Sequence, residues 1–579
     1  ASNKTFTKMQ ISLHKKIVVL TFVLQCTCFF SSIVVIESFT YPRRQQQQLK
    51  SESLTKLVRN SSNKNGRFHL NRKEKSSSTS STQLATGTSS STSDGNHDED
   101  SSTSTTAAIM KRKIDREFLS IAFPAFLQQA AVPLADLIDA AFLRKLDPSA
   151  LGGMGIARAS QAAVSKLYNT PLSKTTISLI ASKYGIAQDK NATHDEKKEL
   201  SVAVSTGLLL ALTVGLIQLF VFSTMSKPIL GLMGVTDTSD MIRSATSYMR
   251  ARAIGLPAST LWLISNGIFR GLGDTTTPLF CSGLLNVISL LLNPLFILRF
   301  QWGASGAALS TAVAQYCALI PLLWSLQKRV PLTLVGGEGK ALPSLLLDSL
   351  KQYLEAGAYL LGRTVARVAA FTYCSRQSAL LGSVAASAYS ITFQLGFQIT
   401  LVCESISIAV QTLLSREMAK NASRPTKIQT TIISHLVRQS ILVGLLSTGL
   451  ISILTYAFRT NIISMMSKNE GIQQVALQAI PPFLLTQVVK GVAFPVNGIV
   501  MGSMDWRFSM LSMFISNAIC FGTLRHPLLE SSTASFVGSG SSSVGRIWTA
   551  WTTFMASQAV FGLVRYASKA GEWKRLHSK

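Results

Sequence analysis

The sequence predicts an all-α polytopic membrane protein with twelve transmembrane helices, arranged as two six-helix bundles that repeat one another in parallel. Three observations support this prediction: long apolar segments, basic residues in alternate loops, and a motif that occurs twice. Of the 579 residues, 47% are hydrophobic and only 15% are charged, whereas a soluble protein usually carries about a quarter charged residues. Apolar stretches of about 18 residues or more recur along the chain, and each is long enough to cross a bilayer.

The first 114 residues are expected to be a targeting region rather than part of the membrane domain. Lys15 and Lys16 precede the apolar run Ile17–Ile36, as in a secretory signal; a thirteenth transmembrane helix is the alternative. Residues 38–90 then hold ten Lys and Arg against two acids, with many Ser and Thr, as in a transit peptide. We therefore divide this region into a signal-like leader, 1–37, and a transit-peptide-like, disordered segment, 38–114. Together they resemble the bipartite plastid presequence of algae such as diatoms.

Twelve apolar spans follow, and several exceed the bilayer thickness, so they must tilt, kink or protrude. The spans are predicted at 118–143, 149–183, 200–223, 242–272, 276–299, 304–327, 347–374, 382–415, 428–458, 471–502, 506–524 and 546–566. The first six form an N-terminal bundle and the last six a C-terminal bundle. The corresponding segments are the N-terminal bundle 115–327, the linker 328–346, the C-terminal bundle 347–566 and the basic tail 567–579.

The net charge of +28 would ordinarily suggest a nucleic-acid partner, but here the basic residues lie in loops and tails between apolar spans. We expect no nucleic-acid partner, because membrane topology explains these residues better. Alternate loops carry most of them, so the positive-inside rule places both termini and the central linker on the same side, cytosol or stroma. An even number of spans agrees with that placement.

An internal repeat supports the two-bundle arrangement. The segment Asn266–Asp274 ends the fourth span and Asn497–Asp505 ends the tenth, and five of their nine positions are identical. The two motifs lie six spans apart, so both halves would enter the membrane in the same orientation. Parallel repeats are a transporter design whose binding site lies between the halves near the midplane. The alternative is two unrelated small-residue packing motifs.

Several longer motifs resemble the multidrug and toxic compound extrusion (MATE) family, in particular its DinF-like branch and the plant plastid members. The motifs are Leu137–Phe142, Ser165–Leu172, Gly267–Leu279, Gly303–Ala308, Gln315–Tyr316, Ile547–Arg565 and Gly571–Trp573. The resemblance covers residues 115–576. It implies a secondary antiporter that expels organic solutes or xenobiotics against a flow of H+ or Na+.

The sequence departs from this family at positions that carry ion coupling. The fifth span usually reads Asn-x-x-x-Asp-Pro, but here Ser289 and Asn293 stand at the two polar positions. The tenth span usually carries Asp-Gly, and here Asn497 takes the place of the acid. The family's coupling chemistry therefore cannot be transferred whole.

Of the carboxylates inside spans, Asp139 and Glu404 are the candidates for ion coupling, with Asp136 as a secondary candidate. A charged carboxylate at bilayer depth is costly unless it is paired or protonated, and desolvation brings its proton exchange closer to neutral pH. Asp139 lies deep in the first span and matches the family position, with Asp136 one turn earlier on the same face. Glu404 is the acid of the eighth span. A hydrogen-bonded carboxylate in a packing seam is the alternative for Asp139.

Amides and lysines supply the remaining candidates for a solute site. Asn293, Asn497 and Gln394 can bind a solute by hydrogen bonds but cannot take up a proton. Lys174 lies on the second span, on the same face as Lys166, and could attract an anion. Snorkelling to the interface is the alternative for these lysines.

Three functional hypotheses follow from these residues. The first is an H+- or Na+-coupled antiporter of small organic solutes, and the second is an uncoupled facilitator or exchanger of organic anions. The third is a flippase for lipid-linked precursors. An enzyme is not expected, because the sequence contains no nucleophile triad, no metal-ligand cluster and no phosphate-binding glycine loop.

We expect a monomer embedded in the lipid bilayer, with no cofactor and no bound metal. The leader predicts the plastid envelope as its location. The plasma membrane or the vacuolar membrane are the alternatives.

Overall fold

The computed structural model describes residues 109–131, 148–188, 192–232, 241–331, 342–420, 426–525 and 543–576. Within these ranges the regular structure is helical, as predicted. The signal-like leader and nearly all of the segment 38–114 lie outside the described residues, and so do Asp136 and Asp139.

The helices follow one another along the chain with short connections. After a helix over residues 109–131, the elements of the first half are α4 (Pro148–Ala187), α5 (His194–Thr224), α6 (Ser226–Leu232), α7 (Ile242–Ala253), α8 (Leu256–Gly271), α9 (Thr276–Pro294), the π-helical turn η1 (Leu295–Arg299) and α10 (Gly303–Arg329). Those of the second half are α11 (Leu342–Leu380), α12 (Ser383–Ala419), α13 (Thr426–Ala457), α14 (Arg459–Met466), α15 (Glu470–Gly502), α16 (Trp506–Arg525), α18 (Ser543–Ala567) and the 3-10 turn η3 (Gly571–Leu576).

These bounds agree with most of the predicted spans to within a few residues, with two informative differences. The first described helix begins at 109, nine residues before the predicted span 118–143 and within the segment 38–114 that was expected to be disordered. The predicted span 242–272 is broken into α7 and α8 at Ile254 and Gly255, directly before Pro257 in the first turn of α8. Proline has no amide hydrogen and favours the first turn of a helix, so it starts a new helix here. Pro171 and Pro495, by contrast, lie inside α4 and α15.

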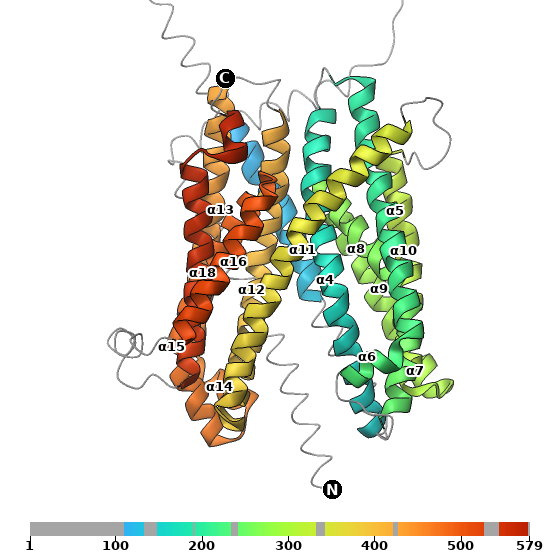
Figure 1. The fold of residues 1–579 in the computed structure, drawn as a ribbon, viewed down its shortest axis with the longest axis vertical. Helices are drawn as coiled ribbons and strands as arrows, with labels where there is room; N and C mark the ends of the chain where they lie inside the picture. Colours follow the sequence, from blue (N-terminus) through green and yellow to red (C-terminus); the bar gives the residue numbers. More distant parts are fainter. Residues whose placement is uncertain are drawn as a thin grey trace, which may run out of the picture.

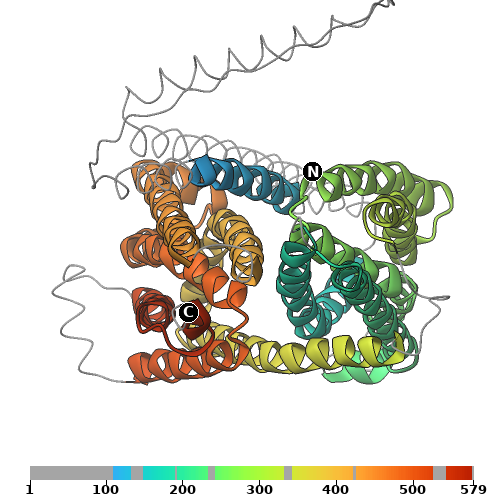
Figure 2. The same ribbon diagram turned by 90° about the horizontal axis from the view of Figure 1, so that it is seen from above.

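The helices form two bundles that stand side by side (Figure 1), with α4 to α10 in one and α12 to α18 in the other. The long helix α11 runs obliquely from the first bundle to the second, along one side of the molecule (Figure 2). Its Tyr353 is buried in the apolar cluster of the first bundle and donates a hydrogen bond to the carbonyl of Ala203 in α5, 3.2 Å away. The helix over 109–131 in turn buries Phe118 and Phe126 in the cluster of the second bundle.

The surface of the helices fits a lipid environment. By length and composition, seven helices of the described ranges are apolar enough to cross a membrane. Phe220, Phe280 and Ile320, on three of these helices, each expose more than two thirds of their surface. Large apolar side chains exposed in this way would be unfavourable in water and are favourable against lipid.

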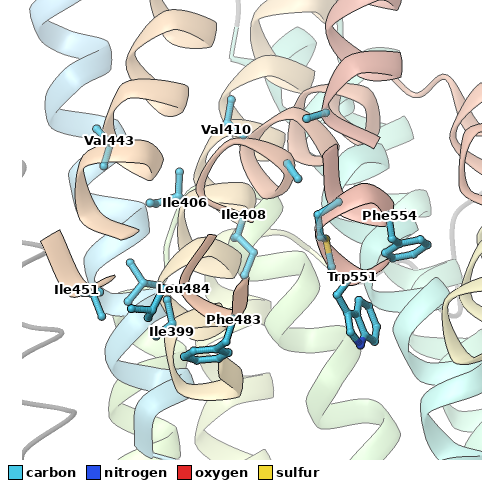
Figure 3. Packing of buried hydrophobic residues seen from close by; sticks show 14 of the residues in the cluster. Ile399, Ile406, Ile408, Val410, Val443, Ile451, Phe483, Leu484, Trp551 and Phe554 are labelled. Carbon is cyan, nitrogen blue, oxygen red and sulfur yellow. The ribbon is translucent and has the colours of Figure 1, made fainter. Parts of the chain in front are cut away.

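The core of the second bundle is built around aromatic side chains. Phe483 of α15 packs edge-on against Trp548 of α18, with ring centroids 4.9 Å apart. The indole N–H of Trp548 donates to the hydroxyl of Thr392 in α12 at 3.0 Å, so its polar atom is satisfied inside the core. Figure 3 shows part of this cluster, with Phe483, Ile406 and Trp551 among its members.

The repeated motif packs in the same way in both halves. A Cβ added at Gly267 of α8 would lie 3.3 Å from the carbonyl oxygen of Ser173 in α4. A Cβ added at Gly498 of α15 would lie 2.6 Å from that of Ser407 in α12. Each glycine therefore brings the fourth helix of its half against the second. This correspondence supports the parallel repeat inferred from the sequence.

The aspartates that end the motif are also equivalent in the structure. Asp274 forms an ion pair with Arg329 at the end of α10, 2.7 Å away, and Asp505 forms one with Arg565 near the end of α18, 2.8 Å away. In both halves the turn after the fourth helix is thus tied to the sixth. Both pairs lie at the end of the molecule where α10 and α18 end (Figure 1), which we call the basic end because the last turns of α10, α12 and α18 carry Lys328, Arg329, Arg416 and Arg565.

Asp274 is held in its ionised form by its surroundings. Burial alone would raise its pKa, but hydrogen bonds from Thr277 and Thr276 and the charge of Arg329 outweigh that effect and lower it. Its carboxylate accepts the backbone amides of Thr276 at 2.9 Å and Thr277 at 3.1 Å. These are the first two amides of α9, so Asp274 caps this helix.

The two bundles meet along a short strip near the basic end. Gln411 of α12 donates to the carbonyl of Lys174 at 3.0 Å and to the hydroxyl of Ser178 at 2.8 Å, both in α4. Ser178 in turn donates to the carbonyl of Met501 in α15 at 2.9 Å. Each hydrogen bond crosses from one bundle to the other, and each lies in the C-terminal half of α4. We call this region the contact strip.

Away from the contact strip, the same two helices are exposed. Seven residues of α4 between 155 and 168 are exposed, and none between 169 and 187. On α12 the exposed residues lie between 383 and 397, and none lies between 398 and 419. The facing helices are therefore in contact near the basic end and accessible toward the other end.

Candidate functional site

An ion pair lies where the contact strip begins and joins the two bundles. Lys174 of α4 pairs with Glu404 of α12. Their side chains remain 19% and 26% exposed, so the pair can still be reached from the open half of the interface. Both residues were predicted as site candidates from the sequence, but not as partners of each other.

Further cations surround this single carboxylate. Arg270 at the end of α8 and Arg367 of α11 lie close enough to Glu404 to interact with its charge. Arg363, one turn before Arg367 on the same face of α11, is also within this range. Positive charge therefore reaches Glu404 from α4 and α8 of the first bundle and from α11, the helix that crosses between the bundles.

In the first half, Arg270 belongs to a network of amides. Gln128 of the helix over 109–131 donates to the Oδ1 of Asn266 at 2.5 Å and to the hydroxyl of Ser282 at 3.0 Å. Arg270 donates to the Oε1 of Gln128 at 2.9 Å. The network links the first, fourth and fifth helices of this half.

In the second half, an arginine takes the place of the glutamine. Arg363 donates to the Oδ1 of Asn497 at 2.9 Å and to the hydroxyl of Ser509. Asn497 donates to the Oε1 of Gln558 in α18 at 3.0 Å. Arg363 and Gln128 occupy corresponding positions, because each lies on the helix that begins its half and bonds the asparagine of the repeated motif. Each half therefore has one arginine in its network. It is Arg270 on the fourth helix of the first half and Arg363 on the first helix of the second half.

Lys490 adds a fifth cation deep in the second bundle. It is only 8% exposed on α15, and its ammonium donates to the hydroxyl of Thr400 at 3.3 Å and to the Oε1 of Gln487 at 3.2 Å. Both partners are neutral. Among the described residues no carboxylate forms an ion pair with it.

Among the described residues, the charges of this region do not balance. Four cations lie inside predicted spans around the carboxylate of Glu404, namely Lys174, Arg270, Arg363 and Arg367, and Lys490 lies deeper in the second bundle. The Nε atoms of Arg270 and Arg363 are buried without a hydrogen-bond partner in the described part of the chain. Buried charge without compensation is costly. The arrangement therefore favours an anion bound between the bundles.

Asn293 and Ser289 lie elsewhere, inside the first bundle. Ser289 is 8% and Asn293 2% exposed, and Asn293 accepts a hydrogen bond from Ser310 of α10. Asn293 lines a pocket between α4, α7, α9 and α10 that also receives Arg158 and Arg252. The family resemblance also predicts that Asp139 lies near Ser289 and Asn293, and this stays a prediction because Asp139 lies outside the described residues.

The remaining sequence candidates are placed as follows. Asn497 is part of the arginine network of the second half. Gln394 is exposed on α12, in the half of that helix that faces away from the contact strip. Lys166 is exposed on α4, two turns from Lys174. In the described ranges no group of three or more His, Cys, Asp and Glu side chains is placed to hold a metal ion.

Four cations of the site were not predicted as site residues from the sequence. Arg363 and Arg367 lie inside the predicted span 347–374, and Lys490 lies inside 471–502. A charged residue within a span is by itself a signal of function, and it could have identified these three. Arg270 was quoted only as part of a family motif, so its charge received no separate interpretation.

Comparisons with known proteins agree with the fold and the repeat. A family model described as MatE matches residues 124–295 and 370–522. The chain is 30% identical to "Protein DETOXIFICATION 44, chloroplastic" of Arabidopsis thaliana over 467 residues, which is 80% of this chain and 85% of that protein.

Solved structures show the same fold. The bent form of the Vibrio cholerae MATE transporter VcmN superposes with a TM-score of 0.67 and 15% identity, over 81% of this chain and 98% of its own. A transporter of the MOP superfamily from Pyrococcus furiosus, whose reported pocket has reverse polarity, gives a TM-score of 0.63 at 15% identity, over 80% and 96%. The predicted fold class, twelve helices in two bundles, is confirmed by this similarity.

Proposed function

Because the chain belongs to the MatE family of membrane transporters, we propose that it carries small organic anions across its membrane as a secondary transporter. The observation that supports this is the excess of cations over acids among the described residues where the two bundles meet. Membership of this family makes the chain a transporter and not an enzyme. The substrate class is our inference from the site.

The chemistry of the cations defines the groups that the substrate should carry. Guanidinium groups bind carboxylate and phosphate groups in bidentate geometry, whereas an ammonium acts as a point charge. Arg270 and Arg363 reach the interface from different halves, with Arg367 beside them. An anion with one or more carboxylate or phosphate groups fits this arrangement, and a cationic drug would be repelled by it.

The family resemblance by itself would favour the export of organic solutes or xenobiotics, without specifying their charge. One transporter of this fold, the Pyrococcus furiosus protein, is described as having a binding pocket of reverse polarity. The similarity to that protein is one of fold alone. The charges in this chain nevertheless support the same kind of reversal here, and among our initial hypotheses they favour the anion transporter.

An antiporter coupled to H+ or Na+ is the second candidate, and it is compatible with an anionic substrate. The pocket around Asn293 favours it, because that pocket lies where the coupling residues of the family are expected. Asp139 is the proposed titrating group. We expect Asp139→Asn to abolish transport driven by a pH gradient in liposomes while leaving anion exchange without a gradient intact. Full gradient-driven transport by this variant would assign coupling elsewhere.

The plastid envelope is the proposed location. The relative described above is named chloroplastic, and so is a second Arabidopsis thaliana relative, "Protein DETOXIFICATION 45, chloroplastic", at 29% identity. The basic, Ser- and Thr-rich leader supports the same location.

Transport by purified protein in liposomes tests the substrate class. We expect uptake of succinate or glucose 6-phosphate and none of tetraethylammonium. Arg367→Gln should reduce anion uptake at least about tenfold, because a hydrogen bond to a charged group contributes roughly 1.5–3 kcal/mol. Arg376→Gln is the matched control, since Arg376 is an exposed arginine on the same helix, remote from Glu404. Uptake of the cation with none of the anions would refute the proposal.

A further inference from the structure

Glu404 occupies a position suited to the substrate itself. It presents a carboxylate to Lys174 and lies within electrostatic range of Arg270 and Arg367. These are the groups that would bind the carboxylate of an anionic solute. Glu404 and an anionic substrate would bind the same cations, and they therefore compete for them.

The pair also joins the two halves of the molecule. Lys174 belongs to α4 of the first bundle and Glu404 to α12 of the second. The other polar contacts between these helices in the contact strip are hydrogen bonds from Gln411 to the Lys174 carbonyl and to Ser178, and the guanidinium of Arg416 over the ring of Tyr184. Lys174 and Glu404 therefore form the ion pair between α4 and α12 in the described part of the interface.

We propose that Glu404 is a built-in competitor of the transported anion, which holds α4 to α12 through Lys174 while the site is empty. This rests on the proposed anion transport. When a substrate anion enters from the open half of the interface, its carboxylate or phosphate takes Lys174 in place of Glu404. The ion pair between Lys174 and Glu404 is then lost, and α4 and α12 can move apart along the contact strip.

Displacement of Glu404 need not leave a buried carboxylate uncompensated. Arg367 is exposed and forms no hydrogen bond with another described residue, so it is free to receive the released carboxylate. The substrate therefore binds the separated state better than the closed one, and a difference of this kind is what shifts a conformational equilibrium.

The first test measures the distance between the bundles at the basic end. Spin labels would be attached at Lys197→Cys on α5 and Ser568→Cys after α18, both exposed there, in full-length protein in lipid nanodiscs with the other accessible cysteines replaced. Without substrate, we expect Glu404→Gln, Lys174→Gln and the double variant to shift the population alike toward longer distances. Glu470→Gln and Lys166→Gln are the controls. Glu470 is an exposed acid in the first turn of α15, so its loss should leave the distances unchanged.

The second test measures binding of succinate to the same proteins. Glu404→Gln should tighten binding about tenfold, because a ligand no longer has to displace a competing state. Lys174→Gln should weaken it. Weaker succinate binding in Glu404→Gln with wild-type distances would overturn the proposal and make Glu404 an ordinary binding or structural residue.

The two tests separate this inference from the proposed function. If the wild type binds neither succinate nor glucose 6-phosphate, the proposed anion transport is refuted. The distances measured without substrate still show whether the ion pair between Lys174 and Glu404 holds the bundles together. If anions bind and the distances of the three variants equal those of the wild type, the competitor role fails and the proposed function stands.

Discussion

At the scale of single residues, neighbouring charges have different roles. Arg363 and Arg367 lie one turn apart on α11, but Arg363 is 3% exposed and bonds Asn497 and Ser509, whereas Arg367 is exposed. Loss of Arg363 would leave buried polar atoms without partners, which costs about 1–3 kcal/mol each. Loss of Arg367 removes charge with little effect on packing, so Arg367 is the more informative position for testing substrate binding.

Asp274 gives a prediction for the pH dependence of stability. Its folded pKa lies below the ordinary value of about 3.9, so its stabilising contribution is complete at neutral pH and is lost as the pH falls through its folded pKa. We expect Asp274→Asn to lower the free energy of unfolding by about 1 kcal/mol at pH 7, as for a lost helix cap, and by less at pH 3.

Thermal unfolding of the detergent-solubilised protein at several pH values would measure this. Asp195→Asn is the control, since Asp195 is an exposed acid at the start of α5. A loss that is as large at pH 3 as at pH 7 would contradict the role of the ionised carboxylate.

Individual site residues could be predicted from the sequence more easily than their partners. Glu404 and Lys174 stood out because a charge inside an apolar span needs an explanation. Their pairing could not be predicted, since they lie 230 residues apart and meet only because two separate bundles pack together. The unbalanced charge of the site likewise becomes visible only when α8, α11, α12 and α15 are placed around it.

At the scale of helices, the sequence was sufficient for most boundaries. The predicted span 471–502 and α15 (Glu470–Gly502) differ by one residue at the start, because polar segments and glycines mark where apolar helices end. The oblique course of α11 could not be predicted. It depends on Tyr353 fitting against Gly207 of α5 in the opposite bundle, with its hydroxyl 2.8 Å from where a Cβ would lie, and no local pattern encodes such a contact.

The repeated glycines give a prediction about helix packing. A Cβ at Gly498 would lie 2.6 Å from both the Ser407 carbonyl oxygen and a methyl carbon of Val410, whereas one at Gly267 would lie 3.3 Å from its nearest neighbours. Gly498→Ala should therefore destabilise the protein by about 1–3 kcal/mol, and Gly267→Ala by clearly less. Melting temperatures of the two variants would measure the difference. Equal losses would mean that the second bundle relaxes as easily as the first.

At the scale of the whole molecule, the bundles touch near the basic end and are accessible toward the other. If the basic end faces the cytosol or stroma, this conformation is closed on that side and open to the opposite one. A transporter with its site between two repeats alternates between such states by rocking one bundle against the other.

Thiol labelling would test this conformation. Ala162 lies in the exposed half of α4 and Thr175 is fully buried in the contact strip half. A membrane-impermeant thiol reagent applied from the side opposite the basic end should label Ala162→Cys, and it should leave Thr175→Cys unmodified. Labelling of Ala162→Cys only from the basic side would show that the predicted orientation is reversed.

The two halves are alike in their networks but not in where the arginine stands. In the first half the guanidinium comes from Arg270 on the fourth helix, and in the second from Arg363 on the first. The pseudo-two-fold axis therefore relates the backbones without relating the charges, and a solute between them meets a left and a right side that are not interchangeable. Such a site can distinguish the two ends of a solute, so an anion with a carboxylate at one end and a phosphate at the other should bind in one preferred orientation.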